Sequence, residues 1–305
     1  MAFTPLNALN AFLAVARRRS FAAAARDLGV SNSALSQAVR QLEARVGTAL
    51  LTRTSRSVAL TEAGQRLLEH AGPAVEQALD ALKTINARPG EVTGRVRLSA
   101  PNAAVPLILK RLVPAFIDRF PRVDLDIQVD NRFVNIVSEG FDAGIRLIEA
   151  IDRDMVQVRL TGPCRVVVAG APSYLKRKGV PETPTDLLKH DCLCFRRTPN
   201  DEPRPWEFER GKKTWRVPVR GPVTVSDPEL IHALALGGHG LLYTLDAVIA
   251  TPLERGRLRV VLERYAPNVP GLFLYFPSRA QVSPALRAFV DVAREIANVA
   301  APTTR

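Results

Sequence analysis

The first sixty residues carry two pairs of helix start and stop signals in close succession, and few folds accommodate that spacing. Ser20 precedes the alanine-rich stretch 21–28, which is followed by Gly29. Ser31 precedes a second stretch, which is followed by Gly47. Serine caps helix N-termini, and glycine adopts the left-handed conformation that ends a helix. The pattern predicts two helices joined by a tight glycine turn, which is a helix-turn-helix.

The second of these helices has an apolar face and a polar face. Its apolar residues recur at i, i+4, i+7 and i+11, which predicts one buried stripe. Polar residues off that stripe cluster near the start of the helix: Ser31, Asn32, Ser33, Ser36, Gln37 and Arg40. Their side chains suit base edges in a major groove of DNA, and the free N–H groups of the helix start suit a phosphate.

Positive charge is concentrated in the same segment. Residues 1–60 contain eight arginines and two acids, so a fifth of the chain supplies six of its twelve net positive charges. The strand-like runs 50–53 and 57–60 predict a hairpin wing, with Arg53 and Arg56 placed to contact phosphates or the minor groove. This arrangement indicates double-stranded DNA as a partner.

A long helix is predicted to follow, capped by Thr61. Small and apolar residues recur in it with spacings of three and four, at Leu67, Ala71, Ala74, Ala78, Leu82 and Ile85. So long a stripe of small and apolar residues favours pairing with a helix of a second chain. The alternative is that this helix packs against its own chain. Gly72-Pro73 interrupts the helix interior, where we expect a kink or a weaker dimer seam.

From Val92 onward, strands alternate with helices, which predicts an α/β fold with a mainly parallel sheet. The expected strands are 96–100, 124–129, 143–146, 165–169, 240–244 and 272–276. The expected helices are 107–120, 133–139, 173–178, 229–236 and 284–300.

The stretch from Leu6 to Leu68 resembles the N-terminal domain of LysR-type transcriptional regulators. The likeness rests on Ser20-Phe21, Ala23-Ala24, Leu28, Val30-Ser31, residues 33–36, Leu42-Glu43, Gly47, Leu50-Leu51, Arg53, Arg56 and residues 60–64. Leu51 stands where the family usually has phenylalanine, which exchanges one apolar residue for another. The resemblance implies that the helix which follows forms dimers. It also implies base contacts by Asn32, Ser33, Ser36 and Gln37, and backbone or minor-groove contacts by Arg53 and Arg56.

The later elements resemble the effector-binding domain of the same family, which is shaped like a periplasmic binding protein. Residues 141–146 and 256–258 agree well with it. The resemblance implies a winged helix-turn-helix domain at 1–61, a linker and dimerisation helix at 62–90, and an effector-binding domain at 91–305. Within the last, 91–162 and 267–305 would form lobe I, and 163–266 lobe II, with crossings near 161–163 and 266–271.

A small molecule in such a fold is expected at the C-terminal ends of strands. The candidate residues are Pro101, Asn102, Ala103, Asn131, Arg146, Ser226 and Asp227. Helix N-termini could bind a carboxylate there, and Arg146 could do so bidentately, although a structural ion pair is an equally good role for it. We therefore expect a small-molecule effector, with carboxylates as one class.

Other chemistries are weakly indicated. His190, Cys192 and Cys194 would share one face of a strand, but zinc needs a fourth ligand, so we expect buried strand residues and neither a metal nor a cofactor. Redox sensing by Cys192 or Cys194 would need a lowered thiol pKa. Trp206 and Trp215 lie within the basic stretch 196–220, which predicts a strand pair rather than a stacking platform for nucleic acid.

Three classes of function compete. An enzyme would need a nucleophile with a base, and the sequence has no Gly-x-Ser-x-Gly motif and only four histidines. A solute-binding protein would need a signal peptide, which we do not recognise. No long apolar run predicts a membrane span, and three cysteines suit the reducing cytosol. We predict a cytoplasmic transcription regulator that binds an imperfect palindrome as a homodimer or homotetramer, with no catalysis.

Overall fold

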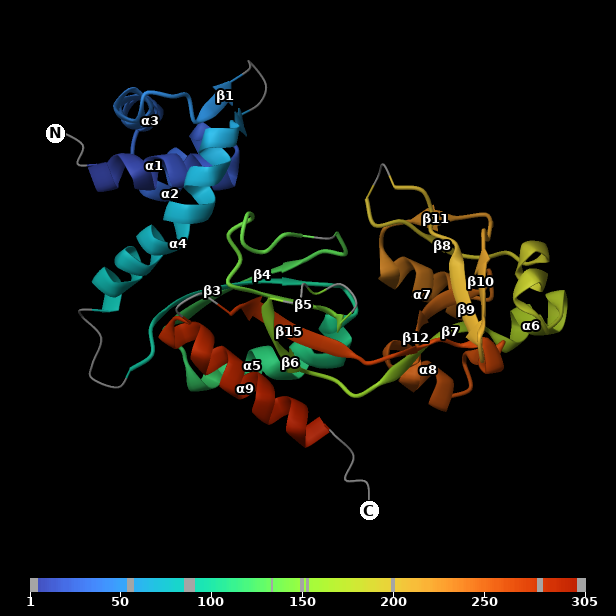
Figure 1. The fold of residues 1–305 in the computed structure, drawn as a ribbon. Helices are drawn as coiled ribbons and strands as arrows, with labels where there is room; N and C mark the ends of the chain where they lie inside the picture. The colour runs from blue at the N-terminus through green and yellow to red at the C-terminus, as the bar shows by residue number, and fades with distance from the viewer. Residues whose placement is uncertain are drawn as a thin grey trace.

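The computed structural model describes residues 5–53, 58–84, 91–132, 134–148, 151, 154–198, 201–278 and 282–300. Figure 1 shows a helical N-terminal unit, a long helix that leads away from it, and two α/β lobes that lie beside each other. Across those described ranges, none of the helices combines the length and the apolar character that crossing a membrane requires.

The N-terminal unit is a helix-turn-helix followed by a two-stranded hairpin. Its elements are α1 (Pro5–Arg18), α2 (Phe21–Leu28), α3 (Asn32–Val46), β1 (Leu51–Arg53) and β2 (Val58–Leu60). The predicted caps are confirmed, because Ser20 Oγ accepts a hydrogen bond from Ala23 N at 3.3 Å and Ser31 Oγ accepts one from Ala34 N at 3.1 Å. Gly29 and Gly47 have the positive φ angles that end α2 and α3.

The linker helix α4 (Glu62–Thr84) begins against the wing. Thr61 caps it as predicted, with its hydroxyl accepting from Gly64 N at 3.0 Å. A Cβ on Gly64 would lie 2.0 Å from Leu50 O, so this position has no room for a side chain.

The predicted seam of α4 is divided between two environments. Leu67 packs against the core of the N-terminal unit, which also buries Leu68 and Val75, whereas Ala74 and Ala78 are exposed. The side chain of Leu82 and the whole of Ile85 lie outside the described residues. The helix continues through Gly72-Pro73, and Figure 1 shows that it changes direction about midway along its length.

The first lobe is a five-stranded sheet in the order β4-β3-β5-β15-β6. Its strands are β3 (Gly94–Ala100), β4 (Val123–Val129), β5 (Ala143–Leu147), β6 (Met155–Arg159) and β15 (Leu272–Pro277). A π-helical turn η1 (Val105–Leu109) leads into α5 (Lys110–Arg119), which packs with α9 (Pro284–Ala300) beneath the sheet (Figure 1). Phe116 of α5 meets Phe289 of α9 edge to face at 5.1 Å between ring centroids.

The second lobe surrounds β7 (Cys164–Gly170), which pairs with β12 (Leu242–Leu245), β13 (Arg259–Val261) and β14 (Asn268–Val269). Its helical elements are α6 (Pro172–Lys178), η3 (Pro184–Lys189), α7 (Pro228–Leu236), η4 (Asp246–Ile249), α8 (Ala250–Glu254) and η5 (Glu263–Tyr265). Two short strands, β8 (Cys194–Phe195) and β11 (Thr224–Val225), pair in parallel. The predicted strand pair around the tryptophans is confirmed as the hairpin β9 (Trp206–Arg210) and β10 (Lys213–Val217).

The structure corrects the expected strand directions and one expected helix. The sheets are mixed rather than mainly parallel: β3 runs parallel to β4 and β5, but β15 and all partners of β7 are antiparallel to their neighbours. The chain leaves the first lobe along β6 and returns to it along β15, so these two neighbouring strands run in opposite directions. The same holds for β7 and β14 in the second lobe. The expected helix 133–139 is a single turn over its described residues, because Asn135 Oδ1 accepts from the N–H groups of Val137 and Ser138, and Gly140 follows with φ +69.

The two segments that connect the lobes lie side by side. Leu160 N donates to Leu272 O at 2.8 Å, and Leu272 N donates to Thr161 Oγ1 at 2.9 Å. A Cβ on Gly271 would lie 2.3 Å from Gly162 O. The connections therefore touch through their backbones, which limits how the lobes can move relative to each other.

The contact at Gly64 yields a stability prediction. Gly64→Ala should lower the free energy of unfolding of the N-terminal unit by about 2 kcal/mol or more, since a methyl group would overlap a backbone carbonyl. Differential scanning calorimetry of the full chain measures this change.

Gly72→Ala, in the same helix, is the matched control. Its Cβ would meet only the side chains of Leu13 and Leu68 at 3.7 Å and that of Arg17 at 4.0 Å. Its stability should stay within about 1 kcal/mol, because alanine's better helix propensity offsets the restriction on a residue before proline. Equal stability of the two variants would contradict the close approach at Leu50.

Candidate nucleic-acid interface and effector pocket

The outer face of α3 brings the predicted base-contacting residues together. Ser31, Asn32, Ser33, Gln37 and Arg40 are exposed, and Ser36 is half-buried. On the opposite face, the stripe of Leu35, Ala38, Val39 and Leu42 is buried in the core of the N-terminal unit. The helix is therefore anchored by apolar packing, while its polar side chains point away from the core.

Local hydrogen bonds hold parts of this face in place. Ser31 Oγ lies 3.0 Å from Ser33 Oγ in addition to capping the helix, and Arg40 Nε donates to Ser36 O at 3.4 Å. The exposed face continues beyond the predicted residues through Gln41, Ala44 and Arg45. The 3.6-residue period of the helix would have identified these three, because they follow Gln37 and Arg40 on the same side.

The wing has the predicted antiparallel pairing, with Leu51 opposite Leu60 and Arg53 opposite Val58. Arg56 and the side chain of Arg53 lie outside the described residues, so their roles stay predictions. The backbone of β1 nevertheless places the wing immediately beside the C-terminal end of α3, with Glu43 Oε1 accepting from Leu50 N at 2.9 Å.

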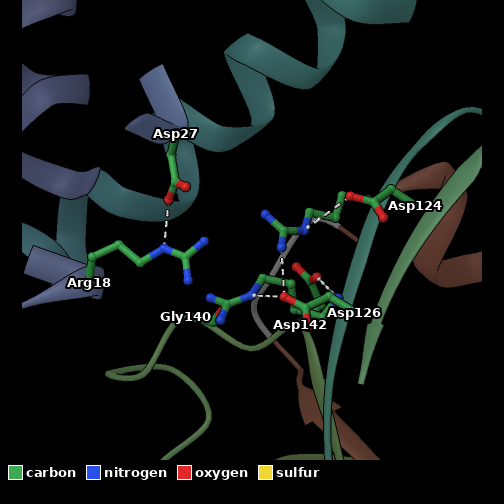
Figure 2. A network of polar contacts seen from close by, with 8 residues as sticks. Arg18, Asp27, Asp124, Asp126, Gly140 and Asp142 are labelled. Atoms are coloured by element: carbon green, nitrogen blue, oxygen red, sulfur yellow. Dashed lines mark hydrogen bonds and ion pairs between the residues drawn. The ribbon is translucent and has the colours of Figure 1, made fainter. Parts of the chain in front are cut away.

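Two arginines at the end of α1 face other parts of the chain. Arg18 Nε donates to Asp27 at 2.6 Å (Figure 2). A Cβ placed on Gly140 of the first lobe would lie 3.5 Å from Arg17 Nε, so Arg17 packs on the turn that ends at Gly140. In this region of the first lobe, Arg97 donates to Gly140 O at 2.8 Å and to Asp126 at 3.1 Å (Figure 2). The basic charge of the N-terminal unit is thus partly used for contacts within the chain.

The predicted effector residues of the first lobe fall into two groups. Pro101, Asn102, Ala103 and Asn131 are half-buried, and Asn102 N donates to Asn131 Oδ1 at 3.1 Å. Arg146 is only 6% exposed. Asn131 thus lies where a small molecule could reach it, whereas Arg146 lies beneath the surface.

Arg146 connects three segments of the first lobe. Its guanidinium donates to Ser99 Oγ at 2.9 Å, to Arg132 O at 3.0 Å and to Ile145 O at 2.7 Å. Burial lowers the pKa of Arg146, and the electrostatic influence of Tyr275 and Asp130 opposes that shift. These contacts give Arg146 a structural role in holding the segment that carries Asn131.

A pocket of about 260 Å³ brings Asn131 together with a segment of the second lobe. The other lining residues are Phe195, Arg196, Arg197, Asp201, Glu202 and Arg204. Three guanidinium groups against two carboxylates favour an anionic occupant. Arg197 Nε lies 3.4 Å from Asp201 Oδ2.

Of the predicted effector residues, only Asn131 lines this pocket. Ser226 and Asp227 are exposed at the start of α7, where Asp227 caps the helix by accepting from Leu230 N at 2.9 Å. The pocket residues between β8 and β9 were missed, because the described part of this segment forms no strand or helix and no periodic pattern marks it. Their one signal was the basic run that begins at Arg196.

The predicted strand of His190, Cys192 and Cys194 is corrected by the structure. His190 follows η3 and its Nδ1 lies 3.2 Å from the Tyr174 hydroxyl oxygen, whereas only Cys194 belongs to a strand, β8. The helical turn η3 ends at Lys189, and His190 has extended backbone angles (φ −105, ψ 156) but belongs to no strand. Within the described ranges, no three histidine, cysteine or acidic side chains gather closely enough to hold a metal ion.

The cysteines are held as thiols. Cys192 and Cys194 are buried, and Cys192 Sγ donates to Leu187 O at 3.6 Å. Burial raises the pKa of Cys192 to about 12 and also raises that of Cys194. Burial likewise raises the pKa of Cys164 to about 11. This environment does not meet the condition for a redox sensor, which is a lowered thiol pKa.

Two protein-family models match the chain. The model for bacterial regulatory helix-turn-helix proteins of the lysR family matches residues 6–65, and the model for the LysR substrate binding domain matches residues 89–298. The transcriptional regulator YcaN of Escherichia coli K12, itself described as uncharacterized, is 38% identical over 92% of this chain and 91% of its own length. The regulator PgrR of the same organism is 34% identical over 93% and 95%.

Two solved structures share the fold over nearly the whole chain. ArgP from Mycobacterium tuberculosis superposes with a TM-score of 0.68 at 20% identity, covering 97% of this chain and 98% of that one. The virulence activator AphB of Vibrio cholerae superposes with a TM-score of 0.64 at 21% identity, covering 96% and 99%.

The buried thiols yield a second prediction. At pH 8, a pKa near 12 leaves about one Cys192 side chain in ten thousand as thiolate, and a pKa near 11 leaves about one in a thousand for Cys164. Ellman's reagent should therefore label the folded chain far more slowly than the denatured chain. Labelling should accelerate as pH rises, because the thiolate fraction increases tenfold per pH unit. Fast labelling of a Cys164→Ser variant would contradict the burial of Cys192 and Cys194.

Proposed function

Because this chain belongs to the LysR family of bacterial transcription regulators, we propose that the exposed face of α3 reads base edges in the major groove of its operator. The chain is a sequence-specific DNA-binding regulator with an effector-binding domain. The proposal assigns base contacts to Asn32, Ser33, Ser36 and Gln37. Ser31, Arg40, Arg53 and Arg56 are assigned to the phosphate backbone or the minor groove.

One observation carries this assignment. Asn32, Ser33 and Gln37 lie on the exposed side of a helix whose opposite side is buried. A helix packed in this way presents its polar side chains at fixed positions, so base edges can be read without first ordering the helix.

We further propose that two copies bind an imperfect palindrome in the cytoplasm, as a homodimer or as half of a homotetramer. The exposed Ala74 and Ala78 of α4 support pairing with a second copy, because small residues let two helices approach closely. The two α3 helices would then enter successive major grooves about 34 Å apart. In this scheme, residues 1–61 bind DNA, 62–90 link and dimerise, and 91–305 bind the effector.

For the effector, we propose a small anion such as a carboxylate, bound in the pocket between Asn131 and the segment 195–204. The arginines that line this pocket support an anion, and its volume of about 260 Å³ supports a small one. Because the lining comes from both lobes, an occupant would bridge 91–162 and 163–266 and thereby bias how the lobes close.

The DNA contact is tested with Gln37→Ala. Removing a bidentate bond to a base should cost about 1–3 kcal/mol against the preferred duplex and relax the choice at one base pair. Selection from a random pool of duplexes, followed by competition binding, measures both effects. Gln157→Ala, which changes an exposed residue of β6, is the control and should leave the preference unaltered. An unchanged preference in Gln37→Ala would rule out the assigned helix face.

The effector pocket is tested by thermal shift of the full chain with a panel of small carboxylates, their neutral amides, and amino acids. An anion at a hundred times its Kd should stabilise the protein by about 2.7 kcal/mol. Arg196→Ala and Arg204→Ala should abolish that shift, whereas Arg220→Ala, outside the pocket, should retain it. Equal shifts with amides, or shifts that survive both pocket variants, would contradict the proposed site.

A further inference from the structure

One side chain in α3 holds the root of the wing. Glu43 lies one turn before the end of α3 and is half-buried. Its Oε1 atom accepts hydrogen bonds from two consecutive backbone groups, Leu50 N at 2.9 Å and Leu51 N at 3.1 Å. A single carboxylate oxygen therefore joins the recognition helix to the first residues of the wing hairpin.

The hairpin itself leaves Leu50 N without its usual acceptor. Leu50 lies one step beyond the pair Leu51–Leu60, so its partner across the hairpin is Thr61. Thr61 N donates to Leu50 O at 3.0 Å, and a regular antiparallel pair would return a bond from Leu50 N to Thr61 O. That carbonyl accepts instead from Gln65 N at 2.8 Å, in the first turn of α4. Because the Thr61 carbonyl is engaged by α4, Leu50 N donates to the carboxylate of Glu43 instead.

The root of the wing is held from two sides. From α4, the Thr61 hydroxyl donates to Ala49 O at 2.8 Å. From α3, the carboxylate of Glu43 supplies the polar contact, and Leu50 and Leu51 are buried in the same apolar core as Leu42. Buried or half-buried N–H groups need acceptors, and a charged acceptor makes the stronger bond. Glu43 thus helps to fix the direction in which β1 leaves the recognition helix.

We propose that Glu43 is a positioning residue for DNA recognition, which sets the wing against the DNA backbone at a fixed place relative to the groove that α3 reads. The inference rests on the proposed function, because it needs α3 and the wing to contact DNA together. Glu43 is one of only two acids in residues 1–60, and the other, Asp27, is paired with Arg18. Both acids near the proposed DNA surface are therefore engaged within the protein.

The sign of the effect separates positioning from simple electrostatics. Removing an acid near DNA should strengthen binding if its charge were all that mattered, because the negative phosphates would be repelled less. Removing a positioning residue should weaken binding, because the wing loses its fixed place. Glu62→Ala is the matched control, since Glu62 is an exposed acid at the start of α4 whose oxygen lies 3.6 Å from Arg66 Nη1.

The experiment compares Glu43→Ala, Glu43→Gln and Glu62→Ala with the unaltered full chain. The probe is the duplex that the unaltered chain selects from a random pool. Hydroxyl-radical footprinting maps the protected sugars, and titrations at several salt concentrations give the number of phosphates that the protein neutralises. Thermal melting of each variant reports whether the N-terminal unit stays folded.

Glu43→Ala should bind at least about tenfold more weakly, because it loses two charge-assisted hydrogen bonds and the loss of one alone is worth about that factor. The variant should no longer show the flanking protection assigned to the wing, but it should keep the central protection assigned to α3. The slope of log affinity against log salt should fall by about 0.9 for each phosphate that the wing no longer neutralises. Glu43→Gln should restore the footprint, because its amide oxygen can accept the same two bonds, and Glu62→Ala should bind at least as well as the unaltered chain.

Three results would overturn the inference. The first is a Glu43→Ala footprint that keeps its flanks. The second is a uniform loss of protection that follows a drop in melting temperature, as a purely structural role would produce. The third is a Glu43→Gln variant that behaves like Glu43→Ala. If the unaltered chain selected no duplex, the proposed function itself would fail, which is distinguishable from all three.

Discussion

Contact between backbones at two glycines fixes how the parts of this molecule fit together. At Gly64 the linker helix begins against the carbonyl of Leu50, and at Gly271 the returning connection between the lobes lies against Gly162. In both places a Cβ would overlap a backbone oxygen, at 2.0 Å and 2.3 Å. The first contact places the wing relative to α4, and the second places the lobes on either side of the candidate pocket. Both candidate sites therefore depend on the absence of a side chain.

The arginines divide into those that build the protein and those that face its surroundings. Arg17, Arg18 and Arg146 contact other parts of the chain, whereas Arg40 and Arg45 extend from the exposed side of α3. Net charge alone therefore overstates the positive surface available to DNA. The packing of each helix decides which arginines face outward. In α3, burial of the apolar stripe places Arg40 and Arg45 on the exposed side.

Local signals in the sequence predicted the N-terminal unit well, because capping serines and terminal glycines act over three or four residues. The same kind of signal was present but overlooked at residues 135–140, where Asn135 and Gly140 limit the structure to one turn. The alternation of strands and helices predicted the α/β architecture of the C-terminal part, and the family resemblance predicted its two lobes, although strand direction depended on how the chain crosses between lobes.

The effector pocket could be predicted only in part. Asn131 follows a strand, which is a local property, and the structure places it in the pocket. Its other walls come from a segment without periodicity, which only tertiary packing brings to Asn131. Arg146 was a candidate ligand by its position at the end of a strand, yet its side chain turns inward to Ser99 and the carbonyl of Arg132. Sequence position does not reveal which way such a side chain turns.

The attachment of the wing to the first turn of α4 has a mechanical consequence. The 23 residues of α4 correspond to about 34 Å of helix, so α4, although bent about midway, acts as a lever between the hairpin at one end and Thr84 at the other. Tilting such a rod by about 10° sweeps its tip through about 6 Å, which is close to the width of the minor groove. A small rotation at one end of α4 thus moves the other end by a distance comparable with the width of a DNA groove.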